Sequence, residues 1–327
     1  MRQTLFLFFL AYCLMLNAQT PQSDLAELVS NKLKFADSTR MLAPWPSDGK
    51  IKVIIDTDAA NEVDDQFAIA LALGYPEKLQ IEGFVAAHYG LRGGSSGIEK
   101  SYKSVLEVLE KADKKDQYKI KKGTDPLAYF DWIPESDGVD FIIKKARTAS
   151  PENPIWVVAI GPATNAAAAI LKDPSIANKM VVLWHGRSKW PVQCWNFNAY
   201  NDTKAAQILF DLPVRLILFD TGTHLTMPME ESAQRIMPNG VMGKYLHEIR
   251  LRSSYASRAD KGLFDMGDIA ALIDHRITKW EVVDAPSVSH DLKYDFNTNR
   301  GKIIRIFDID RDASFKLLDE ALTRLNK

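Results

Sequence analysis

The alternation of short β-branched runs with apolar helical stretches constrains the fold of this chain more than any other sequence feature. Runs rich in Ile and Val predict buried strands over residues 51–55, 79–87, 155–160, 180–184 and 214–219. Helical apolar spacing occupies stretches between them, over residues 64–73, 100–112 and 164–171. Strands that alternate with helices favour a mostly parallel sheet covered by helices on both faces. We therefore expect a doubly wound α/β fold.

The N-terminal segment does not fit this pattern and predicts export. Arg2 precedes an uncharged run of twelve residues, Leu5 to Leu16, which ends shortly before Ala18. This run is shorter than the ~18 residues that span a bilayer. We expect residues 1–18 to be a signal peptide, so that the mature chain is periplasmic or secreted and has no membrane anchor. Lipidation of Cys13 is the alternative, but Tyr12 is large for a lipoprotein cleavage site.

The rest of the chain divides into an extension and one domain. Residues 19–49 predict an N-terminal extension, which ends in a linker with two prolines and a glycine between Ala43 and Gly49. Residues 50–327 show no internal repeat, low-complexity tract or second linker, so we interpret them as a single domain. If the signal peptide is removed, Cys194 is the one cysteine left and no intramolecular disulfide can form.

The charge balance excludes one class of partner. The chain has 41 Lys and Arg residues against 42 Asp and Glu residues, a formal net charge of −1. Binding to a phosphate backbone requires a basic excess, so we expect no nucleic-acid partner. A hydrophobic content of 46% argues against a disordered scaffold.

An acidic loop directly follows the first predicted strand. Five of the ten residues from 56 to 65 are acidic: Asp56, Asp58, Glu62, Asp64 and Asp65. Crowding carboxylates at one strand end is costly unless a cation, hydrogen bonds or the next helix N-terminus compensates. Hard oxygen ligands select calcium or magnesium rather than zinc. Charge density alone leaves two interpretations open, a metal site and a solvated loop that caps a helix.

Four motifs follow one another between residue 51 and about residue 275, and together they are specific. They are Asp56-Thr57-Asp58 with Asp64-Asp65, then Ile160-Gly161-Pro162-Ala163-Thr164-Asn165, then Asn196-Phe197-Asn198, and then Gly267-Asp268-Ile269-Ala270-Ala271. In this order they resemble the signature of the nucleoside hydrolase family, of the type that prefers inosine and uridine. That family cleaves N-ribosidic bonds with a bound calcium ion. The resemblance implies the same doubly wound fold and favours a metal site in the acidic loop.

The resemblance also implies a role for each matching residue. Calcium would be held by Asp58, Asp65, Asp268 and the main-chain carbonyl of Ile160. Asp58 would also accept a proton from the attacking water, and Asp56 would orient the loop. The substrate would contact Asp64, His88, Asn196, Asn198 and Asp268.

Several residues around the substrate depart from the family pattern. Asn196 stands where a Glu usually binds the 5′ side of the sugar, and His88 lies where an Asn commonly touches the sugar. Gly267 replaces a His that often helps the base to depart. His88 and His185 each follow a predicted strand and are candidates to protonate the leaving base, although a lone His is more often structural. The loop from Ala59 to Val63 is longer than usual and could reshape the approach to the metal.

Three functions remain open. The motifs predict calcium-dependent hydrolysis of the N-glycosidic bond of nucleosides or related N-ribosides. Gly267 and Asn196 leave the alternative of a catalytically weak sugar- or nucleoside-binding protein on the same fold. The acidic loop alone is also compatible with another metal-dependent hydrolase, although no Gly-rich phosphate loop is present.

Other properties follow from the sequence less directly. The resemblance suggests a homo-oligomer but assigns no surface to it. Trp184, Trp190 and Trp195 cluster around Cys194, where they could stack on a flat base or pack in the core. The preferred base and sugar are left open.

Overall fold

A computed structural model describes residues 40–45, 50–254, 256–257 and 260–326 of the chain. The predicted signal peptide and most of the extension lie outside the described residues, whereas every strand and helix predicted above lies within them. Among the helices of the described part, none combines the length and apolar character needed to cross a membrane.

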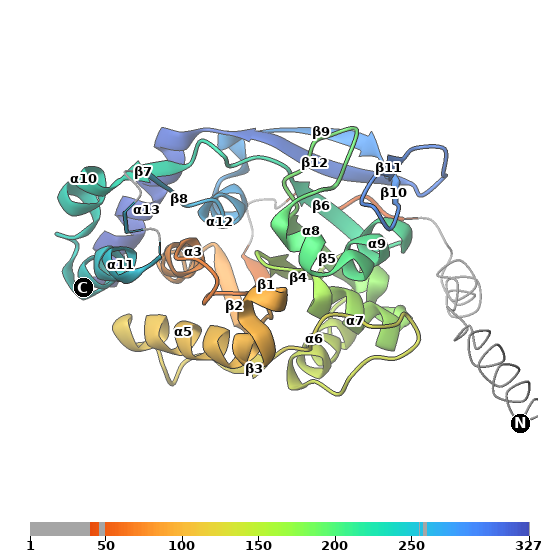
Figure 1. Cartoon of the computed structure of the whole chain (residues 1–327), viewed down its shortest axis with the longest axis horizontal. Coiled ribbons are helices and arrows are strands. Elements are labelled where there is room, and N and C mark those ends of the chain that lie inside the picture. Colours follow the sequence, from red (N-terminus) through yellow and green to blue (C-terminus); the bar gives the residue numbers. More distant parts are fainter. Residues whose placement is uncertain (1–39, 46–49, 255, 258–259, 327) are drawn as a thin grey trace, which may run out of the picture.

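The centre of the molecule is an eight-stranded sheet in the order β3-β2-β1-β4-β5-β6-β12-β9 (Figure 1). All neighbouring strands are parallel except β9, which runs antiparallel to β12 at one edge. The five predicted strands are confirmed. The strands of the sheet are β1 (Ile51–Thr57), β2 (Leu79–Ala86), β3 (Ile120–Lys122), β4 (Ile155–Ala159), β5 (Met180–His185), β6 (Arg215–Phe219), β9 (Thr278–Asp284) and β12 (Lys302–Ile309).

Helices cover both faces of this sheet, as the doubly wound fold predicts. Side chains alternate between two cores along each strand: Val53 and Ile55 pack into one core, and Ile54 packs into the other. One core is covered by α3 (Asp64–Leu73), α5 (Gly97–Lys111), α11 (Gly240–Arg252), α12 (Met266–Ile273) and α13 (Arg311–Leu325). The other is covered by α6 (Asp137–Arg147), α7 (Thr164–Lys172) and α9 (Thr203–Asp211).

Short elements connect these layers. Two pairs of short strands lie outside the main sheet, β7 (Thr226–Pro228) with β8 (Asp260–Gly262) and β10 (Ser287–Val288) with β11 (Tyr294–Asp295). The remaining helical turns are α4 (Gly90–Gly93), η1 (Gly94–Ser96), η2 (Pro174–Lys179), α8 (Phe197–Asn201), α10 (Met229–Glu231), η3 (Ser232–Ile236) and η4 (His275–Ile277).

Helix α3 matches its predicted span residue for residue, and its end is fixed by packing. Gly74 follows the helix, and a Cβ at that position would lie 2.4 Å from the Cβ of Ala321 in α13. Glycine therefore allows α13 to approach the C-terminal end of α3 closely.

Arg40, in the described part of the extension, anchors it to the domain. The buried guanidinium of Arg40 donates hydrogen bonds to the carbonyl oxygens of Leu209 (3.1 Å) and Phe210 (2.5 Å) in the last turn of α9, and to that of Val214 (2.7 Å) just before β6. The two carbonyls of α9 lie in its last turn, where no further helical amide can bond them, so the guanidinium caps the helix.

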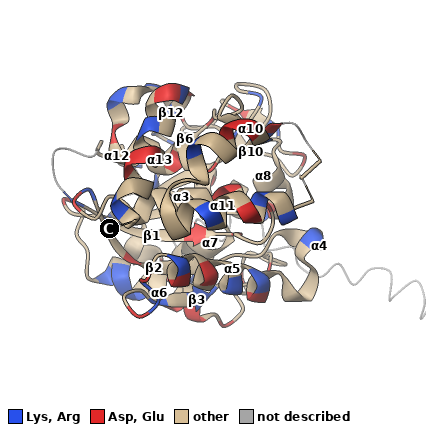
Figure 2. Ribbon diagram, turned by 90° about the vertical axis from the view of Figure 1, so that its left-hand side faces the viewer, with Lys and Arg blue, Asp and Glu red and all other residues tan. Residues whose placement is uncertain are grey.

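Charged side chains are mixed over the surface. Acidic and basic residues alternate along α5, α11 and α13 on the side shown in Figure 2. The mixture agrees with the near-zero net charge, and the described residues visible from that side form no extended basic face.

The strand order also places a ligand crevice. From β1 the chain moves to β2 and β3 in one direction, and β4, β5 and β6 follow on the other side of β1. In open parallel sheets, loops diverge at such a switch point and ligands bind beyond the carboxyl ends of the strands there. The carboxyl ends of β1 and β4 meet this description.

Candidate active site

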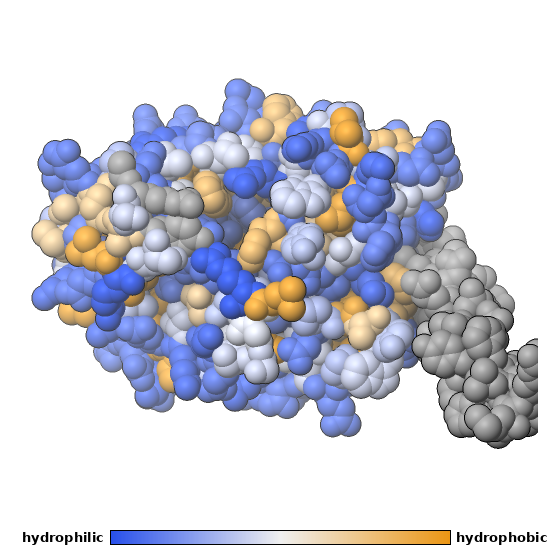
Figure 3. Space-filling view, in the orientation of Figure 1, coloured by the Kyte–Doolittle hydropathy of each residue, from blue (hydrophilic) through white to orange (hydrophobic). Residues whose placement is uncertain are grey.

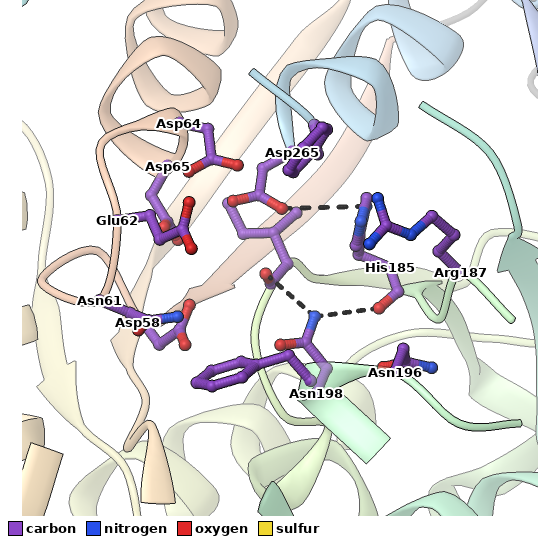
Figure 4. Close-up of a pocket in the computed structure, with 13 residues that line it drawn as sticks. Asp58, Asn61, Glu62, Asp64, Asp65, His185, Arg187, Asn196, Asn198 and Asp265 are labelled. Carbon is purple, nitrogen blue, oxygen red and sulfur yellow. Dashed lines mark hydrogen bonds and ion pairs between the residues drawn. The ribbon is translucent and has the colours of Figure 1, made fainter. Parts of the chain in front are cut away.

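A pocket of about 120 Å³ lies beyond the carboxyl ends of β1, β4 and β5 (Figure 4). Seven residues proposed as site residues from the sequence line it: Asp58, Asp64, Asp65, Ile160, His185, Asn196 and Asn198. The other lining residues are Asn61, Glu62, Arg187, Phe197, Phe264 and Asp265. His88 and Asp268, both predicted to contact substrate, are not among the lining residues.

The acidic loop is held by hydrogen bonds from several elements. The main-chain carbonyl of Asp58 accepts a bond from the Asn61 amide (2.8 Å), which closes a turn. Gln66 in α3 and Ser104 in α5 both donate to the carbonyl of Ala59, at 2.5 and 2.8 Å. The loop between Asp58 and α3 is therefore fixed even though it is longer than the family pattern.

The carboxylates at the start of α3 occupy a favourable position. Asp64 and Asp65 form the first turn, where the helix dipole stabilises negative charge. The hydroxyl of Thr57, the last residue of β1, donates a 2.5 Å hydrogen bond to Asp65 Oδ1. The strand end thus orients the carboxylate that the resemblance assigns to the metal.

Strand β4 approaches Asp58 closely because a glycine follows it. A Cβ on Gly161 would lie 3.0 Å from Cγ and Oδ1 of Asp58. The amide of Ile160 donates to the Asp56 carbonyl (2.9 Å), so the two strand ends stay in register. Asp56 itself lies outside the pocket and accepts a hydrogen bond from Asn165 (2.8 Å), which suits the loop-orienting role predicted for it.

Three carboxylates can share one ion. Asp64, Asp65 and Asp265 each offer an oxygen within 4.8 Å of the others. Burial and repulsion by Asp64 raise the pKa of Asp65 to about 8. Burial, followed by the charges of Asp64 and Asp65, raises the pKa of Asp265 well above its ordinary value. Such shifts mark a site with an excess of negative charge that a bound cation would relieve.

The unpaired oxygens of the site fit a hard cation. Within the described residues, Asp58 Oδ2 and Asp268 Oδ1 are buried without a hydrogen-bond partner. Burial and the neighbouring Asp65 also raise the pKa of Asp58 well above its ordinary value. All these donors are oxygens, so the residues present suit calcium or magnesium.

A buried lysine balances part of this charge. Lys261, on β8, is 2% exposed, and its Nζ lies 2.8 Å from Glu62 Oε2 and 3.3 Å from Asp64 Oδ1. Burial lowers the pKa of Lys261, but the two carboxylates outweigh that effect and the net shift is upward. Lys261 was not singled out in the sequence because it lies far along the chain from the acidic loop.

Asp268 lies behind His185. His185 Nδ1 and Asp268 Oδ2 are 2.6 Å apart, and His185 also lies 3.8 Å from Asp265 Oδ1. These three residues form a second group that could hold a metal ion. Asp268 therefore contacts the pocket through His185. Its assignment as a metal ligand stays a prediction.

His88 and Gly267 both depart from the family pattern, and neither brings a histidine into the pocket. His88 accepts a bond from the Gly90 amide (3.1 Å) and its Nε2 lies 2.7 Å from Thr164 Oγ1, outside the pocket. A Cβ on Gly267 would lie only 2.5 Å from Phe219 Cζ and 2.8 Å from Leu225 Cδ1. No histidine side chain fits at residue 267 in this packing.

The two predicted asparagines are fixed by main-chain groups. Asn196 caps α8 by accepting a bond from the Ala199 amide (2.9 Å), so part of its hydrogen-bonding capacity is already used. Asn198 donates to the carbonyl of His185 (3.0 Å) and, at 3.5 Å, to that of Ile160 (Figure 4). Asn198 thus ties β4 and β5 together at the pocket floor.

The three tryptophans have different environments. Trp184 is fully buried and donates to the carbonyl of Gly161 (3.2 Å), and Trp190 packs against Tyr294 and Phe296. Core packing is therefore the correct interpretation for Trp184. Trp195 is 54% exposed and lines a second, wider cavity next to the pocket.

Sequence reasoning missed Asp265, Glu62 and Arg187 as site residues. Glu62 belongs to the acidic loop that was recognised, and Arg187 follows the candidate His185 by two residues. Asp265 precedes Asp268 by three residues at the start of a helix, a spacing that places both on one side. That spacing is the signal that could have found it.

Comparisons with known proteins identify the family of this site. The family model described as "Inosine-uridine preferring nucleoside hydrolase" matches residues 53–314. A probable uridine nucleosidase of Arabidopsis thaliana is 28% identical over 225 residues, 61% of this chain and 68% of the relative. A pyrimidine-specific ribonucleoside hydrolase of Escherichia coli is 25% identical over 217 residues, 58% of this chain and 67% of the relative.

Solved structures agree on the fold. A plant nucleoside hydrolase superposes with a TM-score of 0.66 at 22% identity, and covers 84% of this chain and 99% of its own. A purine-preferring ribonucleoside hydrolase from Gardnerella vaginalis gives a TM-score of 0.65 at 21% identity, with the same coverage of 84% and 99%. The family match covers most of the domain and all four motifs, and the chain therefore belongs to the inosine-uridine preferring nucleoside hydrolase family, a family of N-glycosyl hydrolases of the nucleosidase type.

Proposed function

We propose that this enzyme hydrolyses the N-glycosidic bond of nucleosides or related N-ribosides with a bound calcium ion, and that Asp58 activates the water. The observation that carries the proposal is the convergence of Asp58, Asp64, Asp65, Asp265 and the Ile160 carbonyl on one pocket at the switch point of the sheet. Family membership supports the reaction class.

The ion would be held by oxygens around the pocket. Asp58, Asp65 and the Ile160 carbonyl are the ligands that the resemblance implies, and Asp265 is added by its place within 4.8 Å of Asp65. Asp268 is the fourth ligand of the resemblance, and its unpartnered Oδ1 is the atom available for that role. Calcium bound there would lower the pKa of a water molecule and so supply a nucleophile near neutral pH.

Asp58 acts as the base in this proposal. Its buried Oδ2 has no partner within the described residues and is available to accept a proton from water. Asp64 and Asn198 hold the sugar hydroxyls while positive charge develops on the sugar carbon. Asn198 is suited to this because two main-chain carbonyls fix its amide.

His185 protonates the departing base. It is the described histidine that lines the pocket, and its Nδ1 is held by Asp268 at 2.6 Å, so Nε2 is the atom left for the leaving group. Gly267 has no side chain to protonate the base, so in this proposal His185, at the end of β5, does so.

The test is a hydrolysis assay on the mature chain with a panel of purine and pyrimidine nucleosides. We expect release of free ribose that stops when calcium is chelated and resumes when it is restored. Asp58→Asn should lower kcat by about 10³-fold or more because it removes the base. Asp312→Asn, an exposed carboxylate on α13, is the matched control and should retain full activity.

Two results would contradict the proposal. Turnover that persists in chelator, or in Asp58→Asn, removes the assigned roles. Calorimetric binding of nucleosides without any ribose release would favour the weak sugar-binding alternative. The names of the relatives above give different substrates, namely uridine, pyrimidine ribonucleosides or purine ribonucleosides, so the panel must include all of these.

We also propose export and self-association. Removal of residues 1–18 in the native host would leave Gln19 as the first residue, which intact-mass measurement checks directly. Retention of Met1 in the purified protein would contradict export by cleavage. Light scattering should give a particle mass of at least twice the mass of one mature chain. A particle with the mass of a single chain would exclude the homo-oligomer.

A further inference from the structure

Two cavities of different size meet at the site. The acidic pocket of about 120 Å³ and a wider cleft of about 910 Å³ share Arg187, Asn196 and Phe197 as lining residues. Sites that enclose ligands of more than a few atoms measure roughly 300–1,000 Å³. A substrate held by its sugar in the small pocket must therefore extend into the wide cleft.

The two cavities carry opposite charge. The small pocket is lined by five carboxylates, Asp58, Glu62, Asp64, Asp65 and Asp265. The cleft is lined by three basic residues, Arg92, Arg187 and Lys189, and by one acidic residue, Asp220. An anionic group is repelled from the first cavity and attracted to the second.

The charged residues of the cleft differ in whether they are already paired within the protein. Asp220 accepts hydrogen bonds from Arg305 (2.6 Å) and from the Ser188 amide (2.5 Å), so its charge is compensated within the protein. Arg92 lies 3.8 Å from Glu62. Within the described residues, Arg187 and Lys189 form no ion pair. Arg187 is held instead by stacking on Phe264, 5.1 Å from the ring centroid, at the junction of the two cavities.

The cleft also presents exposed aromatic rings. Trp195 and Tyr200 are 54% and 62% exposed, and their ring centroids lie 6.3 Å apart. Exposed aromatic faces beside a cavity provide stacking surface for a planar group. In the middle of the face shown in Figure 3, apolar surface lies directly beside strongly hydrophilic surface.

We propose that the substrate is an N-riboside that carries a negatively charged group outside its ribose ring, and that Arg187 binds this group in the wide cleft. The inference rests on the proposed function and specifies its substrate class. A guanidinium without an ion-pair partner, fixed at the cavity junction, can bind a phosphate or a carboxylate with two parallel hydrogen bonds. The charged group can belong to the 5′ side of the sugar or to the base.

The test compares matched neutral and anionic substrates at saturating calcium. Uridine and inosine are the neutral members, their 5′-monophosphates place the charge on the sugar side, and orotidine places it on the base. We expect kcat/KM for at least one anionic class to exceed that of its neutral counterpart by about tenfold or more. The class that gains identifies the end of the substrate that enters the cleft.

Arg187→Gln tests the assigned residue. It keeps a polar side chain but removes the charge, so the ratio of anionic to neutral kcat/KM should fall about tenfold, mainly through KM. Arg147→Gln, on α6 and away from both cavities, is the matched control and should leave the ratio unchanged. Added salt should reduce the wild-type ratio but have little effect on that of Arg187→Gln.

The outcomes separate this inference from the proposed function. If nucleosides are hydrolysed and no anionic substrate is preferred, or if Arg187→Gln leaves the ratio intact, the inference is wrong and the proposed function stands. If no substrate is hydrolysed, the proposed function fails. Calorimetry then tests whether the cleft contains an anion site. Uridine 5′-monophosphate or orotidine that binds more tightly than uridine, with the difference lost in Arg187→Gln, supports the site. Equal binding of the anionic and neutral compounds overturns it.

Discussion

Two histidines occupy similar places at the ends of strands, yet their surroundings differ in every respect that matters for chemistry. His88 lies two residues beyond β2, and His185 is the last residue of β5. Both ring nitrogens of His88 are bonded within the protein, whereas His185 has its Nδ1 on Asp268 and lines the pocket. A position after a strand therefore brings a histidine near the active end of the sheet but does not decide its role.

The hydrogen-bond chain of His88 explains its structural character. Thr164 donates its hydroxyl hydrogen to Asp202 (2.7 Å), so His88 Nε2 must donate to the Thr164 oxygen, while Nδ1 accepts from the Gly90 amide. This arrangement fixes one neutral tautomer. Burial lowers the pKa of His88 to about 4. A ring in this state has no atom left for a substrate, which makes the predicted sugar contact difficult to satisfy.

The largest effect that would separate the two histidines is expected in His185→Gln. The variant should lower kcat for nucleosides by about 10²–10³-fold because it removes the proton donor for the base. Hydrolysis of p-nitrophenyl riboside should change little, since p-nitrophenolate leaves without protonation. His290→Gln replaces an exposed histidine and is the control. An equal loss with both kinds of substrate would mean that His185 does not protonate the leaving group.

The pH dependence of stability should identify His88 as the buried neutral member of the pair. Its folded pKa of about 4 lies below the unfolded value of 6.5, so the unfolded chain binds more protons between these values. Its contribution is therefore fully present above pH ~6.5 and is lost as the pH falls towards 4, by up to about 3 kcal/mol. Urea unfolding of the wild type and His88→Gln at several pH values measures this. A difference between the two proteins that does not shrink on acidification would contradict it.

The smallest effect is expected from the hydrogen-bond chain itself. Thr164→Val keeps the shape of the buried side chain but leaves the His88 N–H and Asp202 without their shared partner. We expect the free energy of unfolding to fall by about 1–2 kcal/mol. Thr148→Val, on an exposed hydroxyl at the end of α6, is the matched control. Unchanged stability of Thr164→Val would show that the chain does not hold His88.

The fold was largely predictable where burial is uniform. Strands β4 and β5 are buried along their whole length, and β1 is buried at every residue except Lys52. Their apolar runs identify them without any knowledge of neighbours. Strand β9 was not predicted. It lies at the sheet edge with exposed residues such as Trp280 and Val282, so its sequence lacks both a continuous apolar run and a regular alternation.

The candidate site was predictable only in its local part. Asp58, Asp64 and Asp65 are neighbours along the chain, and their crowding is visible in the sequence itself. Asp265 and Lys261 lie about 200 residues further on. Asp265, at the start of α12, lines the same pocket, and Lys261, on β8, forms ion pairs with two of its carboxylates. The four motifs indicated a metal site, but which oxygens share the ion depends on how these elements pack.

The sequence by itself determined the parallel sheet, helix α3 and the acidic loop, because strand and helix propensity and local charge density depend on residues that are close along the chain. The tertiary structure alone decided that His185 opens onto the pocket while His88 is sealed, that Asp265 joins the carboxylates, and that Arg187 stands between an acidic and a basic cavity. These outcomes depend on desolvation and on Coulomb interactions through space, and both are set by the neighbours that folding brings together.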